Sequence, residues 1–280
     1  MDFKTFGRLI LIEQTLFALP FAYLGIMFAG KAQLSVWIWV TIALAAARTA
    51  GMSFNRVLDV EIDSKNPRTK DRLLPQGLVS KLSVWLIAAA SCLILIFSAY
   101  MLNALCFYLS FAAVVLLFTY SFFKRFSSSS HFYLGFVEAA APVGGFFAVT
   151  GSLNILPFIL GITIMAWIAG LDIVYAIQDI EFDKSEKLHS IPSSMGKDKA
   201  LVISACCYVL SLASLSAAGL MAQMGAAFWI ALFCMALIFA YQQKLARSRN
   251  VADAVKKFFK ANMFISPVLF IGTFIDVYFF

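Results

Sequence analysis

Long apolar stretches separated by short polar breaks run along the whole chain. A helix needs about 20 mainly apolar residues to cross a bilayer, and nine stretches are close to that length or exceed it. They lie at 9–29, 35–58, 82–101, 104–122, 132–150, 154–178, 199–220, 224–242 and 262–279. The pattern predicts an all-α, polytopic membrane protein in which residues 1–280 form a single domain with nine transmembrane helices.

The composition and the placement of charge support this fold and give it an orientation. Of the 280 residues, 62% are hydrophobic and 13% are charged, which leaves too little polar surface for a water-soluble globule. Lysine and arginine gather in alternate connections, and the opposite side receives only Lys31. Because basic residues mark the cytoplasmic side, we expect a multi-pass membrane protein with a cytoplasmic N-terminus. The net charge of +7 then reflects topology and indicates no nucleic-acid partner.

The connection at 244–261 is compatible with two structures. Its apolar residues Val251, Val255, Phe258 and Phe259 lie among basic ones, a pattern typical of an amphipathic helix at the membrane interface. A solvated basic tether fits the same residues, and the sequence does not choose between them. The five cysteines lie in apolar runs without metal-ligand spacing, so we expect neither structural zinc nor a disulfide framework.

An internal repeat is the most informative feature of the chain. Residues Asn55, Asp59 and Asp63 are spaced by four at the end of the second predicted helix, and a similar set follows at the end of the sixth: Tyr175, Asp179 and Asp183. Helices four spans apart run parallel, so both sets face the cytoplasm. We therefore expect two similar four-helix units plus one helix around a central cavity, with the active site facing the cytoplasm.

The repeated acidic sets predict a metal and diphosphate site. Residues at i, i+4 and i+8 share one face of a helix, and carboxylate and amide oxygens are the ligands that Mg²⁺ prefers, together with substrate phosphates. Our candidate metal ligands are Asn55, Asp59, Asp63, Asp179 and Asp183, of which the four aspartates are also the catalytic candidates. A single set of this kind would usually be a solvated helix end paired with neighbouring lysines, but two matched sets at the membrane boundary favour a function.

Basic residues beside the acidic sets are candidates for binding the diphosphate. They are Arg68, Lys70, Arg72, Lys124, Arg125 and Lys187. Arg48 differs from them because it lies deep in the second predicted helix, where a charged side chain is expected either to form an ion pair or to have a function. It pairs either with a carboxylate-bearing acceptor or with Glu138 or Asp172. His131 and His189 fall in predicted loops and are given no metal role.

Several motifs, taken in order along the chain, resemble those of one family. Residues 55–63, Asn-Arg-Val-Leu-Asp-Val-Glu-Ile-Asp, resemble the first motif, NxxxDxxxD, of the UbiA superfamily of intramembrane aromatic prenyltransferases, and residues 172–183 are similar to its second motif, DxxYAxxDxxxD. Residues 66–77 resemble the basic stretch that ends in a Pro-x-Gly turn, and residues 120–125 resemble the end of the fourth helix with its lysine and arginine. Arg48 falls where the family has an arginine before the first motif.

The resemblance implies a nine-helix bundle around a cavity, in a bacterial-type inner (plasma) membrane, with a Mg²⁺-dependent activity. The expected reaction transfers a polyprenyl group from polyprenyl diphosphate to an aromatic acid of the 4-hydroxybenzoate type, as in ubiquinone and menaquinone synthesis. The candidate acceptor-binding residues are Arg48, Asn55, Tyr175 and Asp172. Arg56 departs from the hydroxybenzoate enzymes, which commonly have an acidic residue there, so 1,4-dihydroxy-6-naphthoate of the futalosine route to menaquinone is an alternative acceptor.

A cation-coupled transporter is the alternative from another functional class, since repeated helical units with acidic residues are also typical of transporters. The acidic residues here lie at helix ends and not at mid-membrane, which favours the enzyme. Nucleotide-binding and protease motifs such as GxxxxGK[ST] and HExxH are missing from the sequence.

Overall fold

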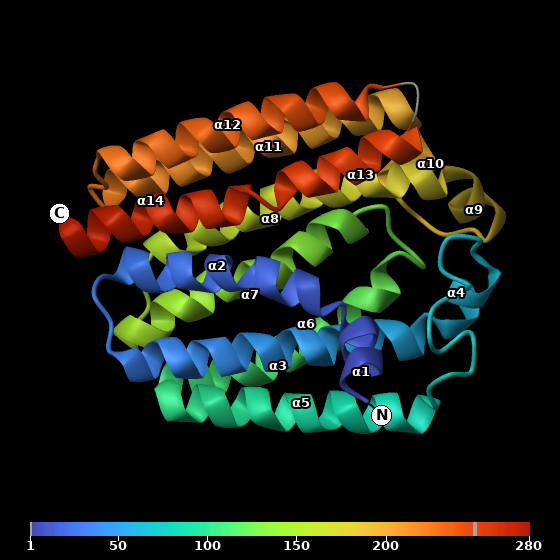
Figure 1. The fold of residues 1–280 in the computed structure, drawn as a ribbon, viewed down its shortest axis with the longest axis horizontal. Helices are drawn as coiled ribbons and strands as arrows, with labels where there is room; N and C mark the ends of the chain where they lie inside the picture. Colours follow the sequence, from blue (N-terminus) through green and yellow to red (C-terminus); the bar gives the residue numbers. More distant parts are fainter. Residues whose placement is uncertain (1, 249–250) are drawn as a thin grey trace.

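The structure, a computed structural model, describes residues 2–248 and 251–280, and these form helices and no strands. The elements are α1 (Phe3–Ile10), α2 (Ile12–Ala29), α3 (Leu34–Leu58), α4 (Val60–Lys65), α5 (Lys81–Leu102), α6 (Ala104–Phe123), α7 (Ser130–Thr150), α8 (Leu156–Ala176), η1 (Ile177–Asp179), α9 (Ile180–Ser185), α10 (Ile191–Met195), α11 (Lys197–Met221), α12 (Ala226–Ala246), α13 (Val251–Asn262) and α14 (Ile265–Phe279). Figure 1 shows the long helices side by side, with α4, α9 and α10 gathered at one end of the bundle.

The number of membrane spans agrees with the apolar pattern, with one difference at the N-terminus. Eight of the described helices are long and apolar enough to cross a membrane, and the count reaches nine when a bent helix pair is taken as one span. That pair is α1 and α2, which meet at 60°. The bend falls at Leu11, whose φ of 51° ends α1 in the left-handed conformation. The chain is therefore an integral membrane protein whose first span is bent, where the sequence predicted one uninterrupted helix at 9–29.

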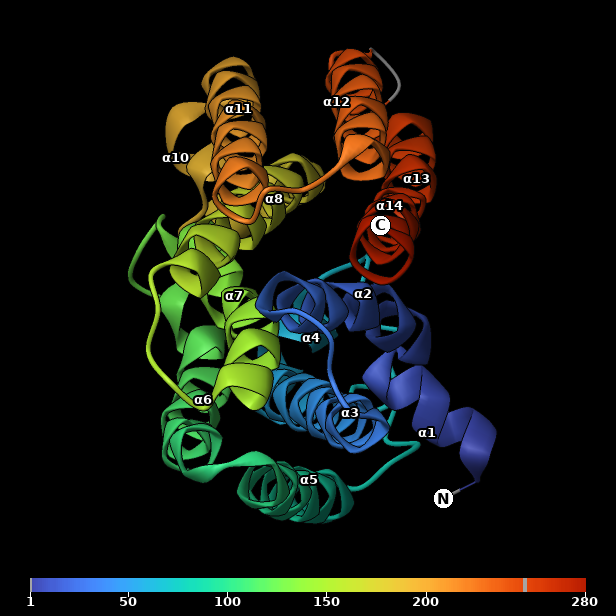
Figure 2. The same ribbon diagram turned by 90° about the vertical axis from the view of Figure 1, so that its left-hand side faces the viewer.

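The two helices that carry the repeated motifs lie on opposite sides of a central pair. In Figure 2, which looks along the bundle, α3, α5 and α6 form one side, α8, α11, α12 and α14 form the other, and α2 and α7 lie between them. α2 packs against α7, and α7 packs against α8. Because α3 and α8 run in the same direction, both motifs reach the same end of the bundle (Figure 1).

Small residues allow the central pair to approach backbone to backbone. A Cβ added to Gly25 of α2 would lie 2.0 Å from the carbonyl oxygen of Pro142, and one added to Gly145 of α7 would lie 2.1 Å from that of Ala22. Such contacts are available only to glycine, and small residues are the usual means by which membrane helices pack closely. The crossing of α2 and α7 is thus fixed by two glycines that face the opposite backbone.

An aromatic cluster fills the core next to this crossing. Trp167 of α8 is fully buried and contacts the rings of Phe17, Phe21 and Phe239 edge to face. Its indole nitrogen donates a 2.9 Å hydrogen bond to Oδ1 of Asn262, so the polar edge of the ring is satisfied inside the bundle. The cluster joins α2, α8 and α12 to the end of α13.

The basic connection at 244–261 is helical over its second part. Val255 and Phe258 of α13 are buried, and the carbonyl oxygen of Phe258 accepts a hydrogen bond from Gln242. The predicted helix is therefore confirmed for residues from Val251 onward, and the alternative of a solvated tether is wrong for them. However, α13 and α14 follow one another along the bundle (Figure 1), and residues from Lys257 onward count as part of the last span.

Candidate active site

Each of the two repeated sets contains a helix break at its middle residue, Asp59 in the first set and Asp179 in the second. Asp59 separates α3 from α4 with φ −99° and ψ 8°, and Asp179 ends η1 before α9 with φ −103° and ψ 7°. Both residues occupy the sparsely populated bridge region of backbone conformations. The sequence repeat is therefore also a repeat of backbone conformation. In the first set the amide of Asp59 still donates to the carbonyl of Asn55, the amide of Asp63 still donates to that of Asp59, and the side chains of Asn55 and Asp59 are in contact, as their spacing predicts.

The two motifs converge, as the repeat predicted. Arg68, which follows α4, donates from Nε to Oδ1 of Asp179 at 3.1 Å and from Nη2 to Oδ2 at 2.6 Å. Nδ2 of Asn66 donates to the same Oδ1 at 3.2 Å. At the exposed edge, Lys65 and Glu186 form a second link, 2.7 Å long. The segment after the first motif is thus bound directly to the second motif.

Asp59 lies at the centre of the first acidic set and is 1% exposed. Its carboxylate accepts a hydrogen bond from Nδ2 of Asn55 at 2.8 Å. Lys124 lies 3.3 Å from Oδ2, and Arg125 lies 3.2 Å from Oδ1. A buried carboxylate is stable only with such partners, and the two basic residues that follow α6 supply them for Asp59.

The remaining aspartates of the motifs also have polar partners. Nη1 of Arg72 donates to both carboxylate oxygens of the buried Asp63, at 2.7 and 2.6 Å. Asp183 accepts a 2.8 Å hydrogen bond from the hydroxyl of Ser190. Four of the six basic residues predicted to bind diphosphate therefore pair with the motif aspartates in this structure. They are Arg68, Arg72, Lys124 and Arg125.

The other two predicted diphosphate ligands, Lys70 and Lys187, are exposed, and neither forms an ion pair with a described residue. Within residues 2–248 and 251–280, no three His, Cys, Asp or Glu side chains are placed to hold one metal ion. In this structure the side chains of Asp59, Asp63 and Asp179 are paired with basic residues. The donor set nevertheless suits Mg²⁺, since it offers hard oxygen ligands from two adjoining segments, and the basic partners have the charge to bind phosphate oxygens instead.

Tyr175, a predicted acceptor ligand, lies beside Arg68. Its hydroxyl accepts a hydrogen bond from Nη1 of Arg68, and the guanidinium carbon lies 4.7 Å from the centre of its ring. Phe259 of α13 contacts the same ring edge to face. Burial lowers the pKa of Arg68, but the hydrogen bond to Asp179 and the nearby Tyr175 outweigh this effect and raise the pKa above its ordinary value. Arg68 is therefore a permanent cation in the site.

Arg48 pairs with Glu138 of α7, one of the alternatives that the sequence left open. The two side chains are 16% and 14% exposed, so the pair is largely removed from solvent. Asp172, the other candidate partner, pairs with His131 instead. In this structure Arg48 thus forms an ion pair within the protein. A role of Arg48 and Asp172 in binding an acceptor stays a prediction.

Three polar residues of this region were missed from the sequence. His131 was expected in a loop, but it lies buried in the first turn of α7. Ser190 caps α10 and binds Asp183, and Asn66 binds Asp179. The serine followed by Pro192 and a second serine at Ser193 was the available signal for the capped helix. Asn66 had a signal only in its nearness to the first motif, and buried His131 had none.

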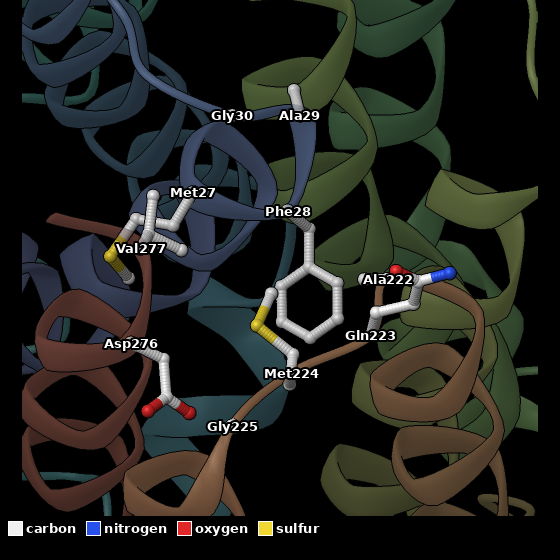
Figure 3. A pocket seen from close by; sticks show the side chains of 10 residues that line it. All are labelled: Met27, Phe28, Ala29, Gly30, Ala222, Gln223, Met224, Gly225, Asp276 and Val277. Atoms are coloured by element: carbon white, nitrogen blue, oxygen red, sulfur yellow. The ribbon is translucent and has the colours of Figure 1, made fainter. Parts of the chain in front are cut away.

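The two cavities that we describe lie away from the acidic sets, so the central cavity stays a prediction. One, of about 270 Å³, lies at the opposite end of the bundle between Met27, Gln223 and Asp276 (Figure 3). There Asp276 of α14 accepts hydrogen bonds from the first amides of α12, a capping role. The other, of about 540 Å³, is an apolar groove along α11 next to Arg247.

Comparison with known proteins finds one family that matches over most of the chain. The profile of the UbiA prenyltransferase family matches residues 18–268. The 4-hydroxybenzoate octaprenyltransferase of Providencia stuartii is 30% identical over 273 residues, covering 98% of this chain and 92% of that protein. The apo structure of a UbiA homolog from Aeropyrum pernix K1 is 31% identical with a TM-score of 0.88, covering 95% of this chain and 98% of that one. A UbiA homolog from Archaeoglobus fulgidus bound to GPP and Mg²⁺ has the same fold, with a TM-score of 0.72 at 19% identity over 96% of this chain and 99% of that one.

Proposed function

The chain belongs to the UbiA prenyltransferase family, and we propose that it transfers a polyprenyl group from polyprenyl diphosphate to an aromatic acid in respiratory quinone synthesis. The observation that carries this proposal is the bidentate contact of Arg68 with Asp179, because it brings both acidic motifs to one place beside a set of basic side chains. A site with carboxylates for a cation and arginines for phosphate oxygens suits a diphosphate.

We propose Mg²⁺ as the cofactor of the site. The residues that would hold it are Asn55, Asp59, Asp63, Asp179 and Asp183. When bound, Mg²⁺ would supply stabilisation of the negative charge that builds on the departing diphosphate. This role is consistent with the homolog from Archaeoglobus fulgidus, whose structure contains GPP and Mg²⁺.

The basic residues have a second task in this proposal. In the structure they neutralise the motif aspartates, and a bound diphosphate offers them phosphate oxygens as alternative partners. We propose that the residues which pair with aspartates, together with Lys70 and Lys187, bind the diphosphate and hold it after the bond to the prenyl group breaks. An exchange of partners avoids leaving either set of charges unpaired inside the bundle.

The acceptor is proposed to bind on the membrane side of the acidic sets. Arg48 would read its carboxylate, with Asn55, Tyr175 and Asp172 around its ring. The aromatic side chains of the bundle would exclude water, which protects a prenyl cation from hydrolysis before the ring attacks it. The names of the relatives favour 4-hydroxybenzoate, and 1,4-dihydroxy-6-naphthoate is the alternative acceptor.

We place the protein in a bacterial-type inner membrane as one catalytic domain over residues 1–280. The N-terminus and the site would face the cytoplasm, because basic residues concentrate at the end of the bundle where the motifs lie. This orientation gives water-soluble acceptors access to the site while the prenyl chain stays in the bilayer.

A competition assay tests the reaction and the acceptor together. Purified protein is incubated with Mg²⁺, a polyprenyl diphosphate and both acceptors, 4-hydroxybenzoate and 1,4-dihydroxy-6-naphthoate, in equal amounts, and products are identified by mass spectrometry. We expect prenylated 4-hydroxybenzoate to dominate. If prenylated naphthoate dominates, the proposed acceptor is wrong but the proposed reaction stands. If no product forms and the protein takes up a solute or ion into proteoliposomes, it is a transporter and the proposed enzymatic function is wrong.

A further inference from the structure

His131 belongs to a buried polar network next to the second motif. Its side chain is 3% exposed, and the imidazole contacts two different elements. Nδ1 lies 2.7 Å from Oδ2 of Asp172 on α8, and Nε2 lies 3.2 Å from the amide nitrogen of Ile191 at the start of α10. A buried ring that is hydrogen bonded at both nitrogens has its position and orientation fixed.

The contacts determine where the ring carries its proton. The amide of Ile191 can only donate, so Nε2 of His131 has to accept. The proton of a neutral imidazole then lies on Nδ1, from which it is donated to Asp172. The pair of His131 and Asp172 is thus a directed hydrogen bond that points one carboxylate oxygen of Asp172 at the ring. The side chain of Asp172 is 28% exposed, which leaves the carboxylate accessible.

The other nitrogen of His131 acts on the end of the motif. Ile191 follows Ser190, whose hydroxyl binds Asp183 and whose side chain and backbone form a capping box with Ser193. By holding the amide of Ile191, the imidazole fixes the start of α10 against α7. The ring therefore contacts Asp172, at one end of the segment from Asp172 to Asp183, directly. It acts on Asp183, at the other end, indirectly, because it holds Ile191 next to Ser190, which binds Asp183.

We propose that His131 is a positioning residue with two separable roles. This proposal rests on the proposed function. Nδ1 orients Asp172 on the acceptor side of the site. Nε2 holds the turn that keeps Ser190 on Asp183, on the side that binds diphosphate and its cation. The residue lies on α7, outside both motifs, and links the two substrate sites through one ring.

Two substitutions separate the roles because each keeps one polar position of the ring. His131→Asn retains a donor near the position of Nδ1, and His131→Gln retains an acceptor near the position of Nε2. The binding of Mg²⁺ with inorganic pyrophosphate is measured by isothermal titration calorimetry, and the acceptor KM is measured by turnover with 4-hydroxybenzoate. His189→Gln is the matched control, since His189 is an exposed histidine of the neighbouring loop.

We expect His131→Asn to weaken binding of magnesium pyrophosphate about five- to tenfold, the loss of one hydrogen bond, with the acceptor KM nearly unchanged. His131→Gln should raise the acceptor KM by a similar factor and leave pyrophosphate binding intact. Equal effects of both variants on both measurements, or wild-type values in both, would overturn the proposal. If the wild type forms no prenylated product, the proposed function fails, whereas the pyrophosphate titration still decides the role of Nε2.

Discussion

Arg68 donates two hydrogen bonds to the carboxylate of Asp179, although 111 residues separate them. Arg68 lies in the segment after the first motif, and Asp179 lies in the second. The bidentate geometry, with Asn66 on the same carboxylate, fixes the relative position of the two motifs more closely than a single charge would. The contact therefore joins the two halves of the site.

Removing this contact is expected to impair diphosphate binding. Arg68→Gln should lower kcat/KM for polyprenyl diphosphate about 10- to 100-fold, since hydrogen bonds to charged groups contribute about 1.5–3 kcal/mol. Arg68→Lys should have a kcat/KM between those of the wild type and Arg68→Gln, because its ammonium group keeps the positive charge but cannot form the bidentate contact of a guanidinium. Arg247→Gln is the control, as the side chain of Arg247 donates its hydrogen bonds within the described residues to Gln243. Wild-type kinetics for Arg68→Gln would remove Arg68 from the site.

Arg48 is expected to serve the acceptor. Arg48→Gln should raise the KM for 4-hydroxybenzoate more than the KM for polyprenyl diphosphate, and it should also destabilise the protein, because Glu138 is left as a buried unpaired charge. The double variant Arg48→Gln with Glu138→Gln removes that charge. It should recover thermal stability while the acceptor KM stays high. Recovery of the acceptor KM as well would make the pair purely structural, and a larger rise in the diphosphate KM would reassign Arg48.

The glycines between α2 and α7 are expected to control stability. Gly145→Ala places a methyl group 2.1 Å from the carbonyl oxygen of Ala22, so the helices have to separate. We expect a loss of about 1–3 kcal/mol, as for other overpacked sites, seen as a lower midpoint of thermal unfolding in detergent. Gly144→Ala is the matched control, because a Cβ there meets nothing within 4 Å. Similar midpoints for the two variants would contradict the close crossing.

Much of the fold and of the site could be predicted from the sequence, for physical reasons. Apolar length alone locates the spans, and the repeated spacing of Asp59 and Asp179 places both motifs at one end, because helices four spans apart run parallel. The bend at Leu11 could not be predicted, since a leucine in the left-handed conformation depends on tertiary packing.

The partners inside the site were equally out of reach. The sequence offered Arg48 three partners, and only the packing of α3 against α7 selects Glu138. His131 looked like a loop residue because its first helical turn is polar, with Ser128, Ser129 and Ser130 before it. Its burial arises from contacts with α8 and α10, which are distant in sequence.

The most direct test of the central claim is a magnesium titration of prenyl transfer. Wild type, Asp59→Asn, Asp179→Asn and the exposed control Asp198→Asn are purified and checked for equal folding by gel filtration and thermal unfolding. Prenylated 4-hydroxybenzoate is then measured by mass spectrometry at increasing Mg²⁺. We expect product from the wild type and Asp198→Asn only when Mg²⁺ is present, and at most about a hundredth of it from the two motif variants. Product without any divalent cation, or wild-type amounts from both motif variants, would contradict the account.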